Sequence, residues 1–380
     1  MNVLIVASWY PTPENPLNGI FFQQRARALA RCGCTVSVAS LDVRTKLGGR
    51  KSGITVERVE DVIEYRYFKR NITPFWEEGI AKQQISMLRK IYERVCNDSG
   101  KPDIIHLDSA RCAYAAVALA KKENIPLTYT EHYSGILNSQ SGTFLDKTMR
   151  LAVENADHTF LLCSAMKHRL KPQEEKCSFL PNSIDFSEFY IKEPSKLFTF
   201  CALASLRKIK GLDILLQAFA KVHDAYPECR LVIGGDGLEK QSLLTMSEEL
   251  GLNEHVTFCG RINSEQRGDF FAGNSAFVCS SLTETFSIVV VEAFASGLPV
   301  VATKCGGPED LVKESNGYLV EKGDVDSLAE GMIKMIQNRN LFDSEKIRKD
   351  AYFLYDESCV VEQQIRYFDK LCKQEFLDEK

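Results

Sequence analysis

Two glutamates, Glu284 and Glu292, enclose the seven residues TFSIVVV, and Gly297, Leu298 and Pro299 follow soon after them. Carboxylates accept hydrogen bonds from hydroxyl groups, so a fixed pair of them can hold a sugar. Glutamates at this spacing are also common by chance on the solvated face of an amphipathic helix. The elements that surround the pair decide between a binding site and ordinary surface charge.

These elements have the order strand, loop and helix. Residues 275–281 are predicted to form a strand, and residues 286–296 a helix that ends at Gly297. The N-terminus of such a helix offers free backbone N–H groups and a positive dipole end to an anion. The hydroxyl groups of Thr285 and Ser287 add donors at the same place.

The two glutamates then lie on either side of this anion site. Glu292 is about five residues into the helix, on the order of 7 Å from its start at 1.5 Å per residue. That distance suits a ribose whose diphosphate sits at the helix N-terminus. Glu284 lies on the loop, where the sugar of the same nucleotide would be. The spacing therefore predicts a site for a nucleotide diphosphate sugar.

Two other patterns are weaker indications of chemistry. Asp324 and Asp326 resemble a metal-binding D-x-D, but they open a predicted helix, so N-capping is expected and no metal site is predicted. The run that starts at Gly235 would need glycine at Lys240 to form the dinucleotide fingerprint G-x-G-x-x-G. A nicotinamide oxidoreductase is therefore not expected.

Apolar, β-branched stretches alternate with helical ones along the whole chain, which favours parallel sheets built from βαβ units. The pattern restarts after a polar, proline-containing segment at residues 181–196. We therefore expect an α/β protein with two doubly wound, Rossmann-like domains, residues 1–190 and 191–356. The final helix, about 357–380, is expected to pack on either domain and is assigned provisionally to the first.

Composition and charge fit this division. The chain has 44% hydrophobic and 26% charged residues, and its apolar runs are shorter than the roughly 18 residues that span a bilayer. The formal charge of −4 divides into +4 for residues 1–190 and −8 for the rest, which suggests different partners for the two halves. Thirteen scattered cysteines and a start without a basic segment predict a cytoplasmic protein with reduced thiols.

An amphipathic helix is predicted within residues 74–95. Its apolar side chains fall on one face and its basic side chains elsewhere: Ile80, Met87, Leu88, Ile91 and Val95 against Lys82, Arg89, Lys90 and Arg94. Such a helix covers a sheet or lies on an anionic membrane with Phe75 and Trp76 at the interface. Peripheral membrane association on the cytoplasmic face is therefore kept as a possibility for a lipid-linked substrate.

The stretch from Glu284 to Gly307 resembles the Glu-x7-Glu signature of retaining GT-B glycosyltransferases, family 4-like, group 1. The similarity extends over nearly the whole chain. Other stretches that resemble the family's motifs contain Gly19, His106, His132, Asn182, Asp185 and Lys210. The resemblance implies two facing Rossmann-like domains with a cleft between them, the first for the acceptor and the second for the donor.

The resemblance also implies a role for each site residue. Glu284, His132 and Lys210 would be catalytic, with Lys210 neutralising the leaving diphosphate in place of a metal. Donor binding would involve Gly19, Arg207, Lys210, Thr285, Phe286, Ser287 and Glu292. No cofactor or metal is expected. The partners would be a nucleotide sugar and a saccharide or lipid-linked acceptor of polysaccharide biosynthesis, such as capsule or lipopolysaccharide, and no nucleic acid.

One position departs from the family's pattern. An arginine is frequent five residues before the lysine, where this chain has Ser205, and Arg207 would have to supply the second cation. Two alternatives to a hexosyltransferase stay open, and Ser205 favours only the second. One is a nucleotide-sugar epimerase of the same fold, which would consume donor without an acceptor. The other is a catalytically silent sugar-nucleotide binding module.

Overall fold

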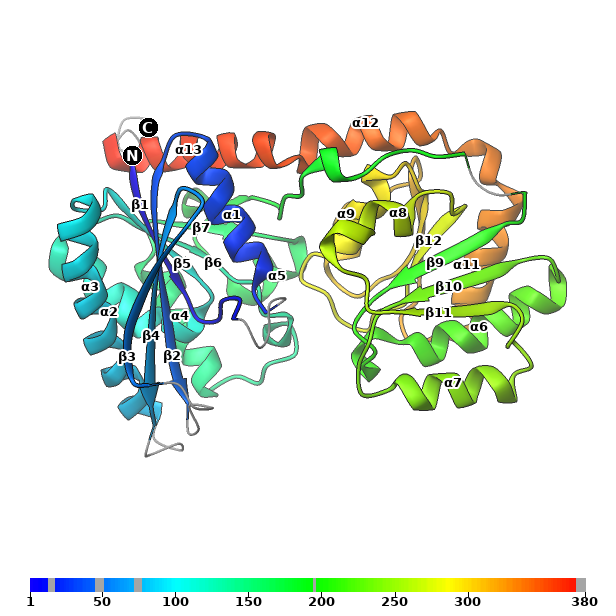
Figure 1. The fold of residues 1–380 in the computed structure, drawn as a ribbon, viewed down its shortest axis with the longest axis horizontal. Helices are drawn as coiled ribbons and strands as arrows, with labels where there is room; N and C mark the ends of the chain where they lie inside the picture. The colour runs from blue at the N-terminus through cyan, green and yellow to red at the C-terminus, as the bar shows by residue number, and fades with distance from the viewer. Residues whose placement is uncertain (13–17, 45–50, 72–76, 194–195, 374–380) are drawn as a thin grey trace. The chain divides into compact units, whose positions relative to one another are not determined.

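The strand-forming stretches build two separate parallel sheets in a computed structural model that describes residues 1–12, 18–44, 51–71, 77–193 and 196–373. The chain divides into two units. The first contains Met1–Leu162, Met166–Pro181 and Glu357–Lys380, and the second contains Cys163–Ala165 and Asn182–Asp356. Each unit is described by itself below, and Figure 1 shows their elements.

The first unit is built on a sheet with the strand order β3-β4-β2-β1-β5-β6-β7-β8 in the described part of the chain. Its strands are β1 (Asn2–Ala7), β2 (Thr35–Arg44), β3 (Gly53–Val59), β4 (Val62–Arg70), β5 (Ile104–Asp108), β6 (Leu127–Thr130), β7 (His158–Leu161) and β8 (Cys177–Phe179). All neighbours pair in parallel except β3, which pairs antiparallel with β4. The hairpin of β3 and β4 was not predicted, because the apolar alternation of β3 (GITVERV) is short and most of this strand is exposed.

Helices α1 (Ile20–Arg31), α2 (Glu77–Ser99), α3 (Ala113–Glu123), α4 (Phe144–Asn155), α5 (Ser164–Leu170) and α13 (Glu357–Lys373) accompany this sheet. The final helix α13 contacts α1, as Figure 1 shows near the chain termini. Its Val360, Val361 and Phe368 are buried in the same core as Ile5 and Phe22. This burial places α13 in the first unit.

Helix α2 covers the sheet. Its Met87, Leu88, Ile91 and Val95 are buried, and the helix packs on α3 and β2. The alternative, in which this apolar face enters a membrane, is therefore wrong for these side chains. The predicted interfacial residues Phe75 and Trp76 lie outside the described residues. Among the residues that are described, no helix is both long and apolar enough to cross a bilayer.

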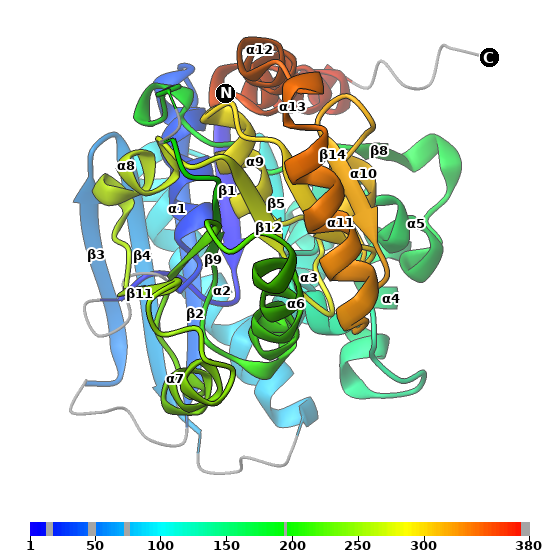
Figure 2. The same cartoon turned by 90° about the vertical axis from the view of Figure 1, so that its right-hand side faces the viewer.

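The second unit has a sheet with the order β11-β10-β9-β12-β13-β14, and every pair is parallel. Its strands are β9 (Thr199–Leu203), β10 (Arg230–Gly234), β11 (Val256–Gly260), β12 (Ala276–Cys279), β13 (Val300–Thr303) and β14 (Gly317–Val320). Its helices are α6 (Leu212–Ala225), α7 (Lys240–Glu249), α8 (Arg267–Phe271), α9 (Ile288–Ala295), α10 (Gly307–Leu311), α11 (Val325–Gln337) and α12 (Ser344–Tyr355). Figure 2 shows α6 and α11 side by side, where they are in contact.

The boundary between the units lies before the expected residue 190. Ile184 forms a β-bridge with Asp356, and the Phe186 amide donates to the Asp356 carboxylate. These contacts join the linker segment to the end of α12.

The predicted N-cap at Asp324 is confirmed, since its Oδ1 accepts from the amides of Asp326 (2.9 Å) and Ser327 (3.0 Å).

Candidate functional site

Glu284 lies on the loop between β12 and α9, and backbone hydrogen bonds to the segment after β13 hold this loop in place. The Glu284 amide donates to the Cys305 carbonyl, and the Gly307 amide donates to the Glu284 carbonyl, both over 2.9 Å. Gly307 permits this approach, because a Cβ there would lie 2.4 Å from Phe286 Cα. The Glu284 side chain therefore projects from a loop whose backbone position is defined.

Lys210 is the partner of Glu284, although 74 positions separate them in the sequence. Its Nζ donates to Glu284 Oε1 over 2.6 Å, and Ser281 Oγ donates to the same oxygen over 2.8 Å. Burial disfavours the ammonium, but the nearby charge of Glu284 outweighs burial and raises the pKa of Lys210. Lys210 is therefore a fixed, fully charged cation beside Glu284.

A close backbone approach brings the two residues together. Gly211 follows Lys210 with φ 59°, and a Cβ there would lie 2.2 Å from the Ser280 carbonyl oxygen. The Ser280 hydroxyl donates to the Lys210 carbonyl over 2.9 Å. The loop after β9 thus packs directly on the loop after β12, as expected for neighbouring parallel strands.

Thr285, Phe286 and Ser287 form the entry to α9, and all three are buried. Ser287 is the N-cap residue, with φ 79° in the left-handed region, and its side chain does not cap the helix. A non-glycine residue in this conformation is uncommon and is often found at functional sites. The Val290 amide donates to the Ser287 carbonyl over 3.1 Å, so the amides that precede it at the N-terminus of α9 are those that can bind an anion.

Glu292 lies on the first turns of α9 and is 2% exposed. Its Oε1 accepts from the Arg267 guanidinium, while its Oε2 is buried without a partner among the described residues. Burial raises the pKa of Glu292, and Arg267 opposes this effect. The site therefore holds a carboxylate oxygen with unused hydrogen-bonding capacity, which a ligand hydroxyl can satisfy.

Arg267 was not among the predicted site residues. It is the first residue of the short helix α8, directly after a 3-10 helix at Ser264–Gln266. No local pattern in the sequence distinguishes this arginine from an ordinary surface charge. The structure identifies its partner as Glu292, 25 residues later.

Arg207, proposed as the second cation, lies in the same turn as Lys210. Its carbonyl accepts from the Lys210 amide over 2.9 Å, and its side chain is exposed, as is Ser205. Arg207 is therefore a neighbour of Lys210 through the backbone. Its guanidinium lies at the surface of the second unit.

In the first unit, Gly19 is the N-cap residue of α1, with φ 75°. A Cβ there would lie 2.8 Å from Trp9 Cδ1 and 3.0 Å from the Trp9 carbonyl oxygen. Glycine is thus required for packing against the end of β1. This packing is independent of the phosphate approach that the sequence predicts.

His132 lies beside the start of α1. Its ring stacks on Phe21 and meets Phe22 edge-on, both with centroids 4.9 Å away. Its Nε2 is 3.2 Å from Asp108 Oδ1, and His106 Nε2 lies at the same distance from that oxygen. Burial lowers the pKa of His132 to about 4, against the opposing effect of Asp108. His132 is therefore a neutral imidazole near pH 7.

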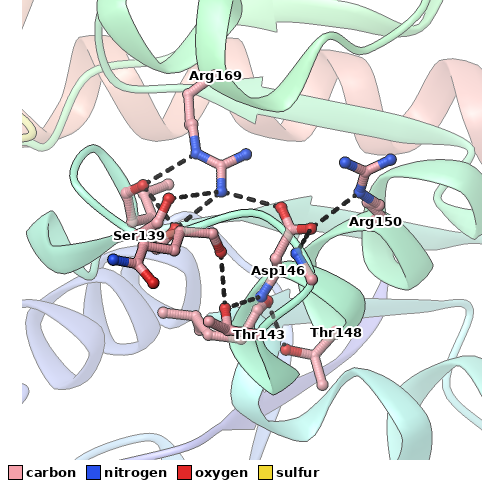
Figure 3. Close-up of polar contacts among 10 residues, drawn as sticks. Ser139, Thr143, Asp146, Thr148, Arg150 and Arg169 are labelled. Atoms are coloured by element: carbon pink, nitrogen blue, oxygen red, sulfur yellow. Dashed lines mark hydrogen bonds and ion pairs between the residues drawn. The ribbon is translucent and has the colours of Figure 1, made fainter.

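The segment after His132 is fixed by Arg169 on α5 and Asp146 on α4 (Figure 3). Arg169 donates to the Ile136 carbonyl (3.1 Å), the Ser139 hydroxyl (2.8 Å) and Asp146 Oδ1 (2.9 Å). Asp146 Oδ2 also accepts from the Gly142 amide over 3.0 Å. These contacts tie residues 134–143 to two helices of the first unit.

The predicted residues therefore form three groups. Lys210 and Glu284 are in direct contact, and Glu292 pairs with Arg267 on the same unit. Gly19 and His132 lie beyond the carboxyl ends of β1 and β6, where His132 packs on the start of α1. The first two groups combine two cations, two carboxylates and a helix N-terminus. This combination can bind a diphosphate together with hydroxyl groups. Among the described residues, no group of acidic, histidine or cysteine side chains could hold a metal.

Two family models match consecutive parts of the chain. "Glycosyltransferase Family 4" matches residues 19–188, and "Glycosyl transferases group 1" matches residues 183–352. An uncharacterized glycosyltransferase of Haemophilus influenzae is 27% identical over 86% of this chain and 90% of its own. The N-acetyl-alpha-D-glucosaminyl L-malate synthase of Bacillus anthracis is 27% identical over 71% of this chain and 75% of its own.

A solved structure is similar over nearly the whole length. It is that of Anabaena HepE in complex with UDP-glucose, with a TM-score of 0.74 at 18% identity. The similarity covers 97% of this chain and 100% of that one.

Proposed function

Since this chain belongs to the family 4, group 1 glycosyltransferases and has the GT-B fold, we propose that it is a retaining, metal-independent hexosyltransferase. It transfers a hexose-type sugar from a nucleotide diphosphate sugar to a saccharide or lipid-linked saccharide. The pathway that this activity serves is the synthesis of a surface polysaccharide or glycan. The observation that carries the proposal is the contact of Lys210 with Glu284 at the entry to α9.

The donor in this proposal occupies the second unit. Its diphosphate binds at the N-terminus of α9, next to the Lys210 ammonium. Lys210 stabilises the negative charge that develops on the leaving phosphate, so no metal is needed for that step. The unpartnered Oε2 of Glu292 supports a hydrogen bond to a ribose hydroxyl, with Arg267 holding the other oxygen.

Glu284 contacts the transferred sugar. Its Oε1 is already shared by Lys210 and Ser281, which leaves Oε2 for a sugar hydroxyl. The bond between the anomeric carbon and the phosphate oxygen breaks, the acceptor hydroxyl oxygen bonds to the anomeric carbon from the same face, and the departing phosphate takes the hydroxyl proton. Attack on the face of departure retains the anomeric configuration. In this proposal His132 contacts the donor sugar as a neutral imidazole, consistent with its lowered pKa of about 4.

The choice of nucleotide follows from the relatives. The Anabaena structure contains UDP-glucose, and the Bacillus anthracis relative is named for an N-acetylglucosaminyl product. A UDP-hexose or UDP-N-acetylhexosamine is therefore the first donor to test. ADP- and GDP-sugars serve as comparisons.

A thermal-shift screen of UDP-, GDP- and ADP-sugars tests the donor site. A ligand present at 100 times its Kd stabilises the native state by about 2.7 kcal/mol, which raises the Tm by several degrees. We expect one UDP-sugar to raise the Tm in wild-type protein, with and without EDTA, and to have a much smaller effect on Glu292→Ala. A shift that needs added Mg²⁺ would contradict metal independence, and no shift with any nucleotide would contradict the proposal.

Turnover distinguishes the enzyme from its alternatives. We expect donor consumption to depend on an added acceptor. Conversion of the donor without an acceptor would indicate an epimerase. Donor binding without conversion under any condition would indicate a silent binding module, for which the exposed Ser205 is the one supporting feature.

A further inference from the structure

Two consecutive serines, Ser280 and Ser281, follow β12, and both are buried. Their hydroxyl groups have different partners. Ser280 donates to the Lys210 carbonyl over 2.9 Å, whereas Ser281 donates to Glu284 Oε1 over 2.8 Å. The first serine therefore fixes the backbone of the cation, and the second contacts the side chain of the carboxylate.

The backbone of Ser281 is itself held in place. Thr303 Oγ1, at the end of β13, donates to the Ser281 carbonyl. The amide of the next residue, Leu282, donates to the Ile209 carbonyl over 2.8 Å. A serine hydroxyl is separated from the backbone by a single rotatable bond, so χ1 alone then decides where Oγ lies. Ser281 is also only 3% exposed, which limits competition by water for its hydroxyl group.

Lys210 is a different kind of donor to Glu284. Its side chain is 24% exposed, and an ammonium group on a four-carbon stem is a flexible point charge with three equivalent N–H groups. Such a group attracts a carboxylate without selecting its orientation. In the proposed function this ammonium also serves the leaving diphosphate, so two anions share it.

The orientation of Glu284 therefore depends on Ser281. Within the described ranges, Lys210 and Ser281 are the two donors to its carboxylate, and both contact Oε1. The Glu284 amide is bound to the Cys305 carbonyl, so the residue is held at its backbone and at one carboxylate oxygen. Its side chain is still 13% exposed, which leaves it within reach of a ligand. A carboxylate that is placed before the ligand binds needs no reorganisation during the reaction.

We propose that Ser281 is a positioning residue for sugar transfer. Its hydroxyl group holds Oε1 of Glu284, and so directs Oε2 to the sugar, while Lys210 serves the diphosphate. The inference rests on the proposed function, because the effect of Ser281 on turnover passes through Glu284. Ser281 itself does not touch the substrate.

Two matched variants test this role. Ser281→Ala removes the positioning hydroxyl, and Ser296→Ala removes another buried hydroxyl of the second unit, one without a hydrogen-bond partner in the part of the chain that the structure describes. Release of UDP is measured from UDP-glucose, UDP-galactose and UDP-N-acetylglucosamine. The acceptors are methyl α-glucoside, methyl N-acetyl-α-glucosaminide and water alone.

Ser281→Ala should lower kcat about tenfold and leave the donor KM little changed. This is the lower end of the effect of losing a hydrogen bond to a charged group, because Lys210 still contacts Oε1. Ser296→Ala should keep the kcat of wild type. Equal kcat in the two variants would refute the positioning role.

A double-mutant cycle separates positioning from a general structural role. In a Glu284→Ala background, Ser281→Ala should cause no further loss of kcat, since no carboxylate is left to position. The same loss in both backgrounds would overturn the inference. Calorimetric titration with UDP should give wild-type affinity for Ser281→Ala. A loss of UDP affinity as large as the loss of kcat would show that the hydroxyl supports the nucleotide site or the fold, and would also overturn it.

Wild-type protein distinguishes this inference from the proposed function. If wild type releases UDP from none of the three sugars with any acceptor, the transferase proposal is wrong and the role of Ser281 falls with it. If wild type transfers sugar and Ser281→Ala does so equally well, only the role of Ser281 is wrong.

Discussion

Replacing Arg267 by alanine should make the stability of the protein depend on pH in a defined way. The guanidinium of Arg267 donates a hydrogen bond to the buried Glu292 carboxylate. Burial raises the pKa of Glu292, and Arg267 limits this effect. Without Arg267 the carboxyl group must either stay charged in a buried position or take up a proton.

Protonation of Glu292 sets an upper limit on the free energy of unfolding that the loss of Arg267 can cost. Removing one partner of a buried ion pair typically costs about 3–5 kcal/mol. Protonation of Glu292 costs about 1.4 kcal/mol for each pH unit above the pKa of an unfolded glutamate, roughly 4.3. The unpaired carboxyl group can therefore lower the free energy of unfolding by at most about 3.7 kcal/mol at pH 7 and only about 1 kcal/mol at pH 5.

The sign follows from proton linkage. A folded-state pKa above the unfolded value means that the native protein holds more protons than the unfolded chain between those two values. The free energy of unfolding of Arg267→Ala should therefore fall, relative to wild type, as the pH rises above the pKa of Glu292 in the folded wild-type protein, which burial already raises above the unfolded value. This deficit, the difference in free energy of unfolding between Arg267→Ala and wild type, becomes constant once the pH exceeds the pKa of Glu292 in the folded variant.

Urea unfolding followed by circular dichroism between about pH 5 and pH 8 measures this deficit. Arg267→Ala in a Glu292→Gln background should show a deficit that does not change with pH, because the amide has no proton to gain. Arg261→Ala, a change at an exposed arginine before α8, should have no effect at any pH. If Arg267→Ala lost the same free energy of unfolding at about pH 5 and at about pH 8, this account of the Arg267–Glu292 pair would be refuted.

Three further results are expected. Glu284→Gln should lower kcat more than it raises the donor KM, because Glu284 faces the sugar that changes during transfer; unchanged turnover would contradict its role. The pH profile of kcat should lack an ionisation of His132 between about pH 5 and pH 8, since burial lowers its pKa to about 4; an inflection lost in His132→Gln would contradict this. Arg169→Ala should increase hydrogen exchange at residues 134–143. The Gly142 amide is the chief cause of the lowered pKa of Asp146, so the stabilisation of the fold by the Asp146 carboxylate should be complete above about pH 4 and disappear as the pH falls further. Protection that is unchanged in Arg169→Ala would show that the segment does not depend on this contact.

The sequence alone was sufficient for features that depend on local pattern. Residues 275–281 and 286–296 were expected as strand and helix, and β12 and α9 occupy these positions. The N-cap at Asp324 and the buried face of α2 followed from residue type and helical period. Such features are readable because a turn or an amphipathic face is encoded within a few neighbouring residues.

Only the tertiary structure decided which charged groups meet. The sequence names Lys210, Glu284 and Glu292 as site residues, but nothing in it pairs Lys210 with Glu284 or Glu292 with Arg267. The adjacency of β9 and β12, with glycine at position 211, brings Lys210 to Glu284. The packing of α8 on α9 brings Arg267 to Glu292.

The position of β4 beside β2 likewise depends on pairing between segments that are separated in the sequence. The register of β2 against β4 places Ser40 beside Arg66, and no local period in either strand specifies it. Pairing of this kind is selected by the combined burial and hydrogen bonding of the whole sheet. The residues of the candidate site could be named from local sequence motifs. Their partners could not, because strand pairing across the whole sheet decides which distant residues meet.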